Sequence, residues 1–327
     1  MAEPYPDSPV DVPWLDLKLG VMRLGLVLGY WDTNRPAEQV EIAVQADDLG
    51  YDSVWASDSR GPNCWGAEAF TTLAWIAAKT TRVHLGAAVA HMAARTPAVT
   101  ALQASVFNQL SGGRFLLGLG LSRPAAVRDW YGQSFPRSPL AATRDYLAAL
   151  RRVWEGGGPS VFIGALGPRN IAQTTRIADG WLPMHWSPFR ATGCADAIRD
   201  APPGFRVAPL AHALLCRDVK AGIATVKERL THYIGGMGLT GDNYHARRMA
   251  WLGFATEARR VHQLYAAGRH ADAVAAMPDA FVDETSLIGP ERRIAERLTA
   301  WRDSGVTDLL AITNDLVTLR ALPGLAR

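Results

Sequence analysis

Short apolar runs alternate with longer amphipathic segments along most of this chain. The runs at 23–29, 51–56 and 83–89 are bounded by glycine or polar residues, as buried strands of a parallel sheet often are. The segments between them carry apolar residues at helical spacing, and proline stands near their starts at Pro36 and Pro97. The pattern therefore predicts strands and helices in strict alternation.

The same alternation continues to the end of the chain. We predict five further strands, at 115–119, 160–164, 181–184, 206–216 and 308–312. The helix that begins near Thr96 carries an apolar stripe of Val99, Leu102, Val106 and Leu110. Eight strands, nearly all followed by a helix, indicate an α/β fold of the closed (β/α)8 TIM-barrel type. A doubly wound open sheet is the alternative, and it usually needs fewer units.

The domain organisation follows from the same pattern. We expect an extended, proline-rich arm over 1–20 and one barrel domain over 21–327. A long stretch of helical and loop character separates the seventh and eighth strands, with an insertion at about 235–288. No internal repeat, low-complexity segment or clear linker divides the chain.

Composition narrows the classes of function. With 48% hydrophobic and 20% charged residues among 327, the chain can bury a large core. The net charge of +3 comes from mixed charges without a basic block, so we expect no nucleic-acid partner. No apolar run reaches the roughly 20 residues that span a bilayer, so we expect no membrane partner. Three cysteines without metal-like spacing suggest reduced thiols in a cytoplasmic protein and no metal site.

Barrel geometry places function on the loops after the carboxyl ends of the strands. Asp58, His91 and His185 lie on such loops. Asp58 either contacts a ligand or caps the local turn, and the histidines are either proton donors or packing residues. Three tryptophans near the mouth either stack on a flat organic ligand or belong to the core: Trp31, Trp65 and Trp186.

Two glycine-containing segments need separate interpretation. Gly167-Pro168-Arg169-Asn170 reads as a helix start whose free N–H groups can bind phosphate, although a plain helix start fits equally well. The stretch SGGRFLLGLGLS at 111–122 reads as the fourth strand and the turn after it. It is not a dinucleotide fingerprint, because Arg123 stands where a third glycine is needed. No GxSxG or Walker sequence occurs.

Several segments together resemble the luciferase-like flavin and deazaflavin oxidoreductases. The matching pieces follow the family's order through most of the chain: GYDSVWASDS at 50–59, RVHLGAAVA at 82–90, RTPAVTALQASVFNQLSGGRFLLGLG at 95–120, ALGPRNIAQTTRIADGWLP at 165–183 and GPERRIAERLTAWRDSGVTDLLAI at 289–312. The resemblance implies a (β/α)8 barrel with a large insertion after strand seven. It also implies coenzyme F420 or FMN at the carboxyl ends of the strands, and a homodimer.

The resemblance assigns roles to particular residues. It places Asp58 against the cofactor ring, and a non-proline cis peptide at Ala88-Val89 against the ring face. Further residues would line the cofactor, namely His91, Leu121 and Ser122. The phosphate would be bound by Leu166, Gly167, Arg169 and Asn170, in agreement with the helix-start interpretation.

One departure from the family limits the substrate. Its sugar-phosphate dehydrogenases have histidine and glutamate where this chain has Ser59 and Arg123, so no sugar-phosphate substrate is assigned. Proton delivery is expected from Ser59, His91 or His185. The first hypothesis is an F420-dependent oxidoreductase that moves a hydride between the deazaflavin C5 and a small organic molecule. The alternatives are an FMN-dependent monooxygenase and a cofactor-binding homologue without turnover.

Overall fold

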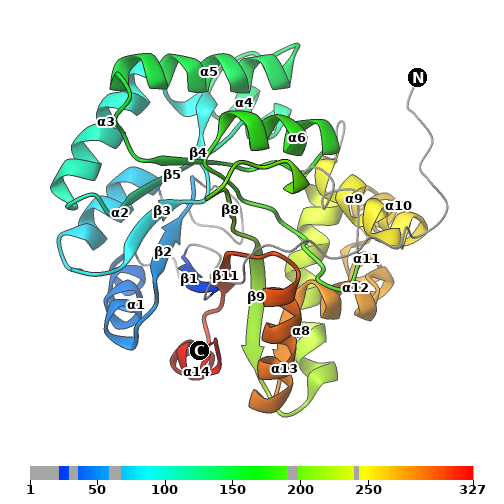
Figure 1. Ribbon diagram of the computed structural model, residues 1–327. Helices are drawn as coiled ribbons and strands as arrows, with labels where there is room; N and C mark the ends of the chain where they lie inside the picture. Colours follow the sequence, from blue (N-terminus) through cyan, green and yellow to red (C-terminus); the bar gives the residue numbers. More distant parts are fainter. Residues whose placement is uncertain (1–21, 29–35, 59–67, 191–197, 239–242, 327) are drawn as a thin grey trace.

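The computed structural model describes residues 22–28, 36–58, 68–190, 198–238 and 243–326. The expected arm over 1–20 lies outside these residues. Within them, parallel strands form one curled sheet with helices outside it (Figure 1). The barrel strands are β1 (Arg23–Val27), β2 (Ser53–Ala56), β3 (His84–Ala87), β4 (Ala90–His91), β5 (Phe115–Gly120), β6 (Ser160–Ile163), β7 (Gly180–Trp181), β8 (Arg206–Val207), β9 (Leu210–Leu215) and β11 (Asp308–Ile312).

The sheet closes on itself. Strand β1 pairs with β2 on one side and with β11 on the other. Strand β8 pairs with β7, and β9, which follows after only Ala208 and Pro209, pairs with β11. Pro209 has no N–H to donate, which explains why the predicted seventh strand is interrupted there. The predicted barrel is confirmed, with its third strand divided into β3 and β4 and its seventh into β8 and β9.

The outer layer consists of helices that follow the strands. They are α1 (Pro36–Leu49), α2 (Ala69–Ala77), the short η1 (Met92–Ala94), α3 (Pro97–Leu110), α4 (Pro124–Asp129), α5 (Pro139–Trp154), α6 (Pro168–Ile177), α13 (Glu291–Asp303) and α14 (Leu316–Ala326). Ile294, Leu298 and Trp301 on α13 are buried, and Gly305 follows its end with a positive φ. That helix therefore packs as its sequence predicts. Within the described residues, no helix is both long and apolar enough to cross a membrane.

Helix α3 buries a different face from the one its apolar stripe suggests. Its stripe is exposed to solvent in this chain, by 45% at Val99, 61% at Leu102, 53% at Val106 and 82% at Leu110. The side chains that pack inward are smaller or aromatic, namely Thr100, Ala101, Ala104 and Phe107. The apolar stripe is therefore not the face that packs inward, because the small alanines let the helix approach the sheet closely.

The segment between β9 and β11 adds a second hydrophobic core beside the barrel. It contains α8 (Val219–Thr231), η2 (His232–Gly236), α9 (Tyr244–Met249), η3 (Ala250–Phe254), α10 (Ala255–Ala266), α11 (His270–Ala276), α12 (Asp279–Glu284) and β10 (Ser286–Gly289). Helices α9 to α12 lie on one side of the barrel, on the right in Figure 1. Strand β10 corrects the helical and loop interpretation, since it pairs in parallel with β9 from Ser286↔His212 to Gly289↔Leu215.

The interior of the barrel is a packed core. Inward side chains from five strands meet there, including Val27, Trp55, Leu116, Phe162 and Leu310. The rings of Trp55 and Phe162 meet edge to face at 5.5 Å between centroids. A filled interior leaves the loops at the carboxyl ends of the strands as the part of the barrel where a ligand can bind.

Candidate functional site at the carboxyl ends of the strands

Asp58, directly after β2, is buried and its carboxylate is fully occupied by protein donors. Oδ1 accepts the N–H of Ala69 at 2.9 Å, while Oδ2 accepts the N–H of His91 at 2.9 Å and Nη1 of Arg95 at 2.7 Å. Burial alone would raise the Asp58 pKa, but the hydrogen bonds from Arg95, Ala69 and His91 hold it below its usual value. The structure thus favours the turn-holding role for Asp58, in which it joins the β2 loop to α2 and β4.

The cis peptide predicted at Ala88-Val89 is present. It lies beside Asp58, whose N–H donates to the Val89 carbonyl at 3.1 Å. A Cβ built on Gly120 would lie 2.6 Å from Val89 Cγ2, so glycine makes room there for the valine. The contact brings the end of β5, and with it the turn at Leu121, next to the Ala88-Val89 segment.

The glycines of the 111–122 stretch therefore serve strand packing. A Cβ on Gly118 would lie 1.9 Å from the Ala87 carbonyl oxygen, and Gly120 accommodates Val89. Close packing is thus enough to explain why these positions are glycine, without a ligand approaching their backbone. Ser122, after β5, has a positive φ of 66°, which is uncommon for a residue other than glycine and marks a sharp turn at the mouth.

His91 and Arg123 lie near each other at the mouth. The His91 ring is half-buried, with Nδ1 2.9 Å from the Tyr131 hydroxyl. Burial lowers its pKa, Asp58 opposes this, and Arg95 and Arg123 lower it further, so the ring is neutral near pH 7. Arg123 stacks over Trp130 at 5.2 Å and forms no ion pair with a carboxylate in the described part of the chain. The loop after β5 therefore presents a positive charge beside a neutral imidazole.

The start of α6 has the properties of an anion site. Gly167 is its N-terminal cap, no side chain accepts from its first amides, and its first turn contains no acidic residue. Asn170 Oδ1 is buried without a hydrogen-bond partner, and the exposed Arg169 adds a positive charge. A Cβ on Gly167 would lie 3.8 Å from the Trp251 ring of η3, so the insertion reaches this helix start. Leu166 is half-buried at the same turn.

His185 belongs to a buried cluster that joins the barrel to the insertion. Its Nε2 lies 3.0 Å from His245 Nδ1 on α9, and its ring packs against Tyr233 and Phe281. Burial lowers the His185 pKa well below its usual value, and the nearby ionisable groups His245, Arg248 and His212 add to this effect. Burial likewise lowers the His245 pKa, to about 4. The two neutral rings share one hydrogen bond through which a proton can pass.

Sequence reasoning missed His245 and His212 as members of this cluster. His212 carried a signal, because it is a polar residue inside the apolar run at 206–216. His245 carried none, since only the packing of the insertion brings it to His185. Trp186 does not line the mouth: it packs in the outer core, and its indole N–H donates to Ser304 Oγ at 3.0 Å. Three predicted residues lie outside the described ones: Ser59, Trp31 and Trp65.

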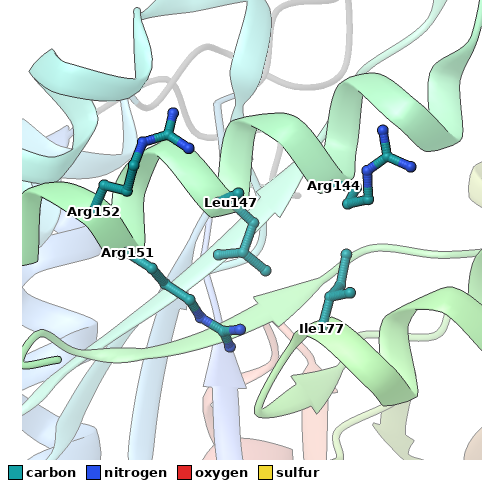
Figure 2. Close-up of a pocket in the computed structure, with 6 residues that line it drawn as sticks. Arg144, Leu147, Arg151, Arg152 and Ile177 are labelled. Atoms are coloured by element: carbon teal, nitrogen blue, oxygen red, sulfur yellow. The ribbon is translucent and has the colours of Figure 1, made fainter. Parts of the chain in front are cut away.

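A metal site or another surface groove could also bind a ligand. Among the described residues, no group of three or more histidine, cysteine or acidic side chains could hold a metal ion. A shallow groove between α5 and α6 on the outer layer is lined by Arg144, Leu147, Ala148, Arg151, Arg152 and Ile177 (Figure 2). None of the sequence-predicted site residues lines it.

Comparisons with known proteins agree with this architecture. The model of the family described as luciferase-like monooxygenase matches residues 18–308. A Mycobacterium tuberculosis protein called "Putative coenzyme F420-dependent oxidoreductase Rv3520c" is 33% identical over 93% of this chain and 99% of its own length. A ketoreductase of Mycobacterium kansasii, named for phthiodiolone and phenolphthiodiolone dimycocerosates, is 25% identical over 72% of this chain and 74% of its own.

Solved structures share the fold at low sequence identity. The coenzyme F420-dependent tetrahydromethanopterin reductase of Methanopyrus kandleri superposes with a TM-score of 0.74 at 17% identity, covering 94% of this chain and 98% of its own. An F420-dependent secondary alcohol dehydrogenase, solved with an F420-acetone adduct, gives 0.75 at 14% identity, covering 94% and 99%. The matched family model and the extended 33% identity together place this chain in the luciferase-like monooxygenase family.

Proposed function

We propose that this chain is an F420-dependent oxidoreductase that transfers a hydride between the deazaflavin C5 and a small organic substrate. The observation that carries the proposal is the start of α6, where the uncapped backbone amides and the exposed Arg169 supply hydrogen-bond donors and a positive charge. These groups suit a phosphate. Relatives named for F420 support this cofactor over FMN.

The residues around the mouth fit such a cofactor. Leu166, Gly167, Arg169 and Asn170 would hold its phosphate. The ring would lie against Ala88, Val89, His91, Leu121 and Ser122. When bound, the deazaflavin supplies the two-electron chemistry, and the protein supplies binding and orientation. Asp58 acts through its partners in this proposal, because its hydrogen bonds fix His91 and the Ala88-Val89 segment rather than reaching a ligand.

A hydride transfer to an organic substrate also needs a proton. His91, hydrogen-bonded to Tyr131, and His185, hydrogen-bonded to His245, are the described candidates for holding it. Both rings are kept neutral by burial, so each offers one N–H and one lone pair. Ser59 remains a third candidate from the sequence.

The first experiment titrates the purified protein separately with F420 and with FMN and follows cofactor fluorescence. We expect F420 to bind and Arg169→Ala to weaken it about tenfold, since one charge-assisted contact is worth about 1.5 kcal/mol. Arg176→Ala is the matched control, because Arg176 is an arginine in the last turn of the same helix. Tight FMN binding without F420 binding would favour the alternative, an FMN-dependent monooxygenase such as the FMN-bound camphane enzyme with a TM-score of 0.67.

Turnover and assembly complete the proposal. Binding of F420 with no reduction of any compound in a broad substrate panel would favour a cofactor-binding homologue without turnover.

We also propose a homodimer that uses the exposed apolar faces of α2 and α3, which contain no charged residue. A cytoplasmic location is proposed as well, in keeping with the free Cys216 thiol; Cys64 and Cys194 lie outside the described residues.

A further inference from the structure

His212 on β9 presents an unpartnered polar atom to the inside of the barrel. Its strand neighbour Leu210 and its register partner Ile312 both belong to the interior core. Alternate residues of a strand share a face, so His212 lies on that interior face too. Its register partner Ile312 is the last residue of β11, so His212 lies at the carboxyl end of the barrel, where a ligand can bind. Its side chain is 5% exposed, and Nε2 is buried with no hydrogen-bond partner.

Ser286 on β10 presents a second such atom directly beside it. Ser286 and His212 are register partners on adjacent parallel strands, which places their Cα atoms about 4.8 Å apart and their side chains on one face. Ser286 is fully buried, and its Oγ also has no partner. Buried polar groups in native proteins are nearly always hydrogen-bonded. Two neighbouring exceptions therefore indicate a place where a further polar group binds.

The chemistry of the pair selects an uncharged oxygen. Burial, assisted by Arg229, lowers the His212 pKa to about 3, so the imidazole is neutral. A neutral imidazole offers one N–H and one lone pair, and a hydroxyl offers a donor and acceptors. The pair can donate to a carbonyl oxygen. The pair can equally accept a hydrogen bond from a substrate hydroxyl group, after the Ser286 hydroxyl rotates or the His212 imidazole changes tautomer.

The surroundings fit an organic ligand. Leu210 and Ile312, the apolar neighbours of His212, belong to the core of the barrel interior. Ile288, two residues after Ser286 on the same face of β10, belongs to the core of the insertion. A few polar groups on apolar walls are typical of small-molecule sites.

We propose that His212 and Ser286 form a subsite that binds the substrate oxygen, as a carbonyl in the oxidised form and as a hydroxyl in the reduced form. This rests on the proposed function. In the reduction, the carbonyl carbon would gain a hydride supplied by the reduced deazaflavin, and the π bond would break. The oxygen would take a proton held by His91 or His185, the described candidates of the proposed function. The substrate class is then an uncharged ketone or aldehyde and its alcohol.

The test uses the full chain labelled with 15N-histidine, titrated with cyclopentanone, cyclopentanol and acetate. The His212 signal is assigned by its loss in His212→Leu. We expect both neutral probes to shift the Nε2 resonance, acetate not to shift it, and Ser286→Ala to raise the cyclopentanone Kd about tenfold. Thr285→Val is the control, because the neighbouring Thr285 hydroxyl already donates to the Phe281 carbonyl and its loss should leave that Kd unchanged.

Several outcomes would overturn the subsite. An unshifted Nε2 resonance, or an equal Kd in Ser286→Ala and wild type, would mean that the pair holds a buried water only. A shift with acetate alone would replace the uncharged class by an anion. F420 titration of the same proteins separates the two proposals: F420 binding without a ketone shift overturns the subsite alone. A shift of the Nε2 resonance with cyclopentanone but no F420 binding would support the subsite and would refute the proposal that F420 is the cofactor.

Discussion

At the scale of single residues, Asp58 has a structural role, whether or not it also contacts a ligand, because its carboxylate accepts hydrogen bonds from Ala69, His91 and Arg95. Its carboxylate and the Arg95 guanidinium are both nearly buried, with side chains 6% and 10% exposed. Breaking a buried pair by removing one partner costs about 3 kcal/mol or more. Without Asp58, Arg95 would keep only the half-exposed Glu68 as a partner, and the Ala69 and His91 N–H groups would lose their acceptor. We expect Asp58→Ala to lower the free energy of unfolding in urea by about 3 kcal/mol and to weaken F420 binding indirectly.

The control for Asp58 is Glu68→Gln. Glu68 also pairs with Arg95, but its side chain is 46% exposed. The Phe70 amide donates to Oε1 and the Thr71 amide to Oε2, so glutamine keeps an acceptor oxygen for one of these two amides. We expect a loss below about 1 kcal/mol. Because the folded pKa of Asp58 lies below 3.8, its contribution is present above pH 4 and is lost as pH falls through the folded value. Equal losses in the two variants would refute the buried-pair account.

The buried histidines predict a second pH dependence, nearer neutrality. Burial lowers the pKa of His212 to about 3 and that of His245 to about 4, against 6.5 as the ordinary value. Below pH 6.5 the unfolded chain binds protons that the folded chain does not, so stability falls as pH falls. Each such histidine contributes about 1.4 kcal/mol per pH unit. We expect His212→Leu to reduce the slope between pH 6 and pH 4.5 by about that amount, and an unchanged slope would contradict it.

Sequence reasoning selected loops that follow the carboxyl ends of the strands, but it could not assign a role to every residue on them. The Ala88-Val89 cis bond came from the family resemblance and was confirmed. The sequence left two roles open for Asp58, a ligand contact and a turn cap. It could not show that Arg95 is the ion-pair partner of Asp58, because the two residues lie on separate loops that only the fold brings together. Trp186 was misplaced because it follows a strand, yet the chain turns back at His185, which has a positive φ of 57°, and the indole enters the outer core.

At the scale of elements, one buried carboxylate holds the closing strands of the barrel together. Asp308 on β11 is 1% exposed and forms ion pairs with Arg23 on β1, at 2.7 Å, and with Arg206 on β8. Burial alone would raise its pKa, but the two guanidinium groups hold it below its usual value. Asp308→Ala is expected to lower the free energy of unfolding by about 3 kcal/mol.

Asp145→Ala provides the comparison for Asp308. Asp145 pairs with Arg144 on the surface of α5, where its side chain is 67% exposed. An exposed pair of this kind contributes little, so thermal and urea unfolding should be nearly unchanged. If Asp145→Ala destabilised the protein as much as Asp308→Ala, barrel closure would not depend on the buried carboxylate.

Element positions could be predicted better than element faces. Proline and glycine punctuation marked α3, α6 and α13 because those residues act locally, through a fixed φ or a permitted positive φ. The inward face of α3 depends on what lies opposite: Ala101 and Ala104 fit closely against the sheet, while the larger Leu102 and Leu110 do not. Strand β10 escaped prediction because its four residues become a strand only by pairing with β9.

At the scale of the whole molecule, the closed barrel was predictable because strand-helix alternation is a local pattern repeated around the ring. The packing of the insertion was not, since it depends on contacts between helices that the sequence does not order. Its consequence for the site is large. His245 reaches His185, Trp251 reaches Gly167, and β10 brings Ser286 beside His212. The insertion therefore supplies neighbours to several of the residues that we propose for the site.

The exposed apolar stripe of α3 indicates how the whole molecule could associate with a second copy. Leu102 and Leu110 on α3 and Trp75 on α2 are 61%, 82% and 63% exposed, on two helices that carry no charge. Both helices pack against the same ring, through the contacts of Phe70 and Phe107 with Phe115. Exposed apolar surface of this extent is typical of an interface between subunits.

If the proposed homodimer forms through α2 and α3, Leu102→Asp should leave the protein monomeric in sedimentation velocity, because a buried carboxylate without a partner opposes association. Val317→Asp is the control: Val317 is 60% exposed, but it lies on α14, whose apolar surface we do not place in the interface. It should leave the sedimentation coefficient unchanged. A monomeric wild type, or a dimer that survives Leu102→Asp but not Val317→Asp, would remove α3 from the interface. Circular dichroism on each variant ensures that the change is in assembly and not in folding.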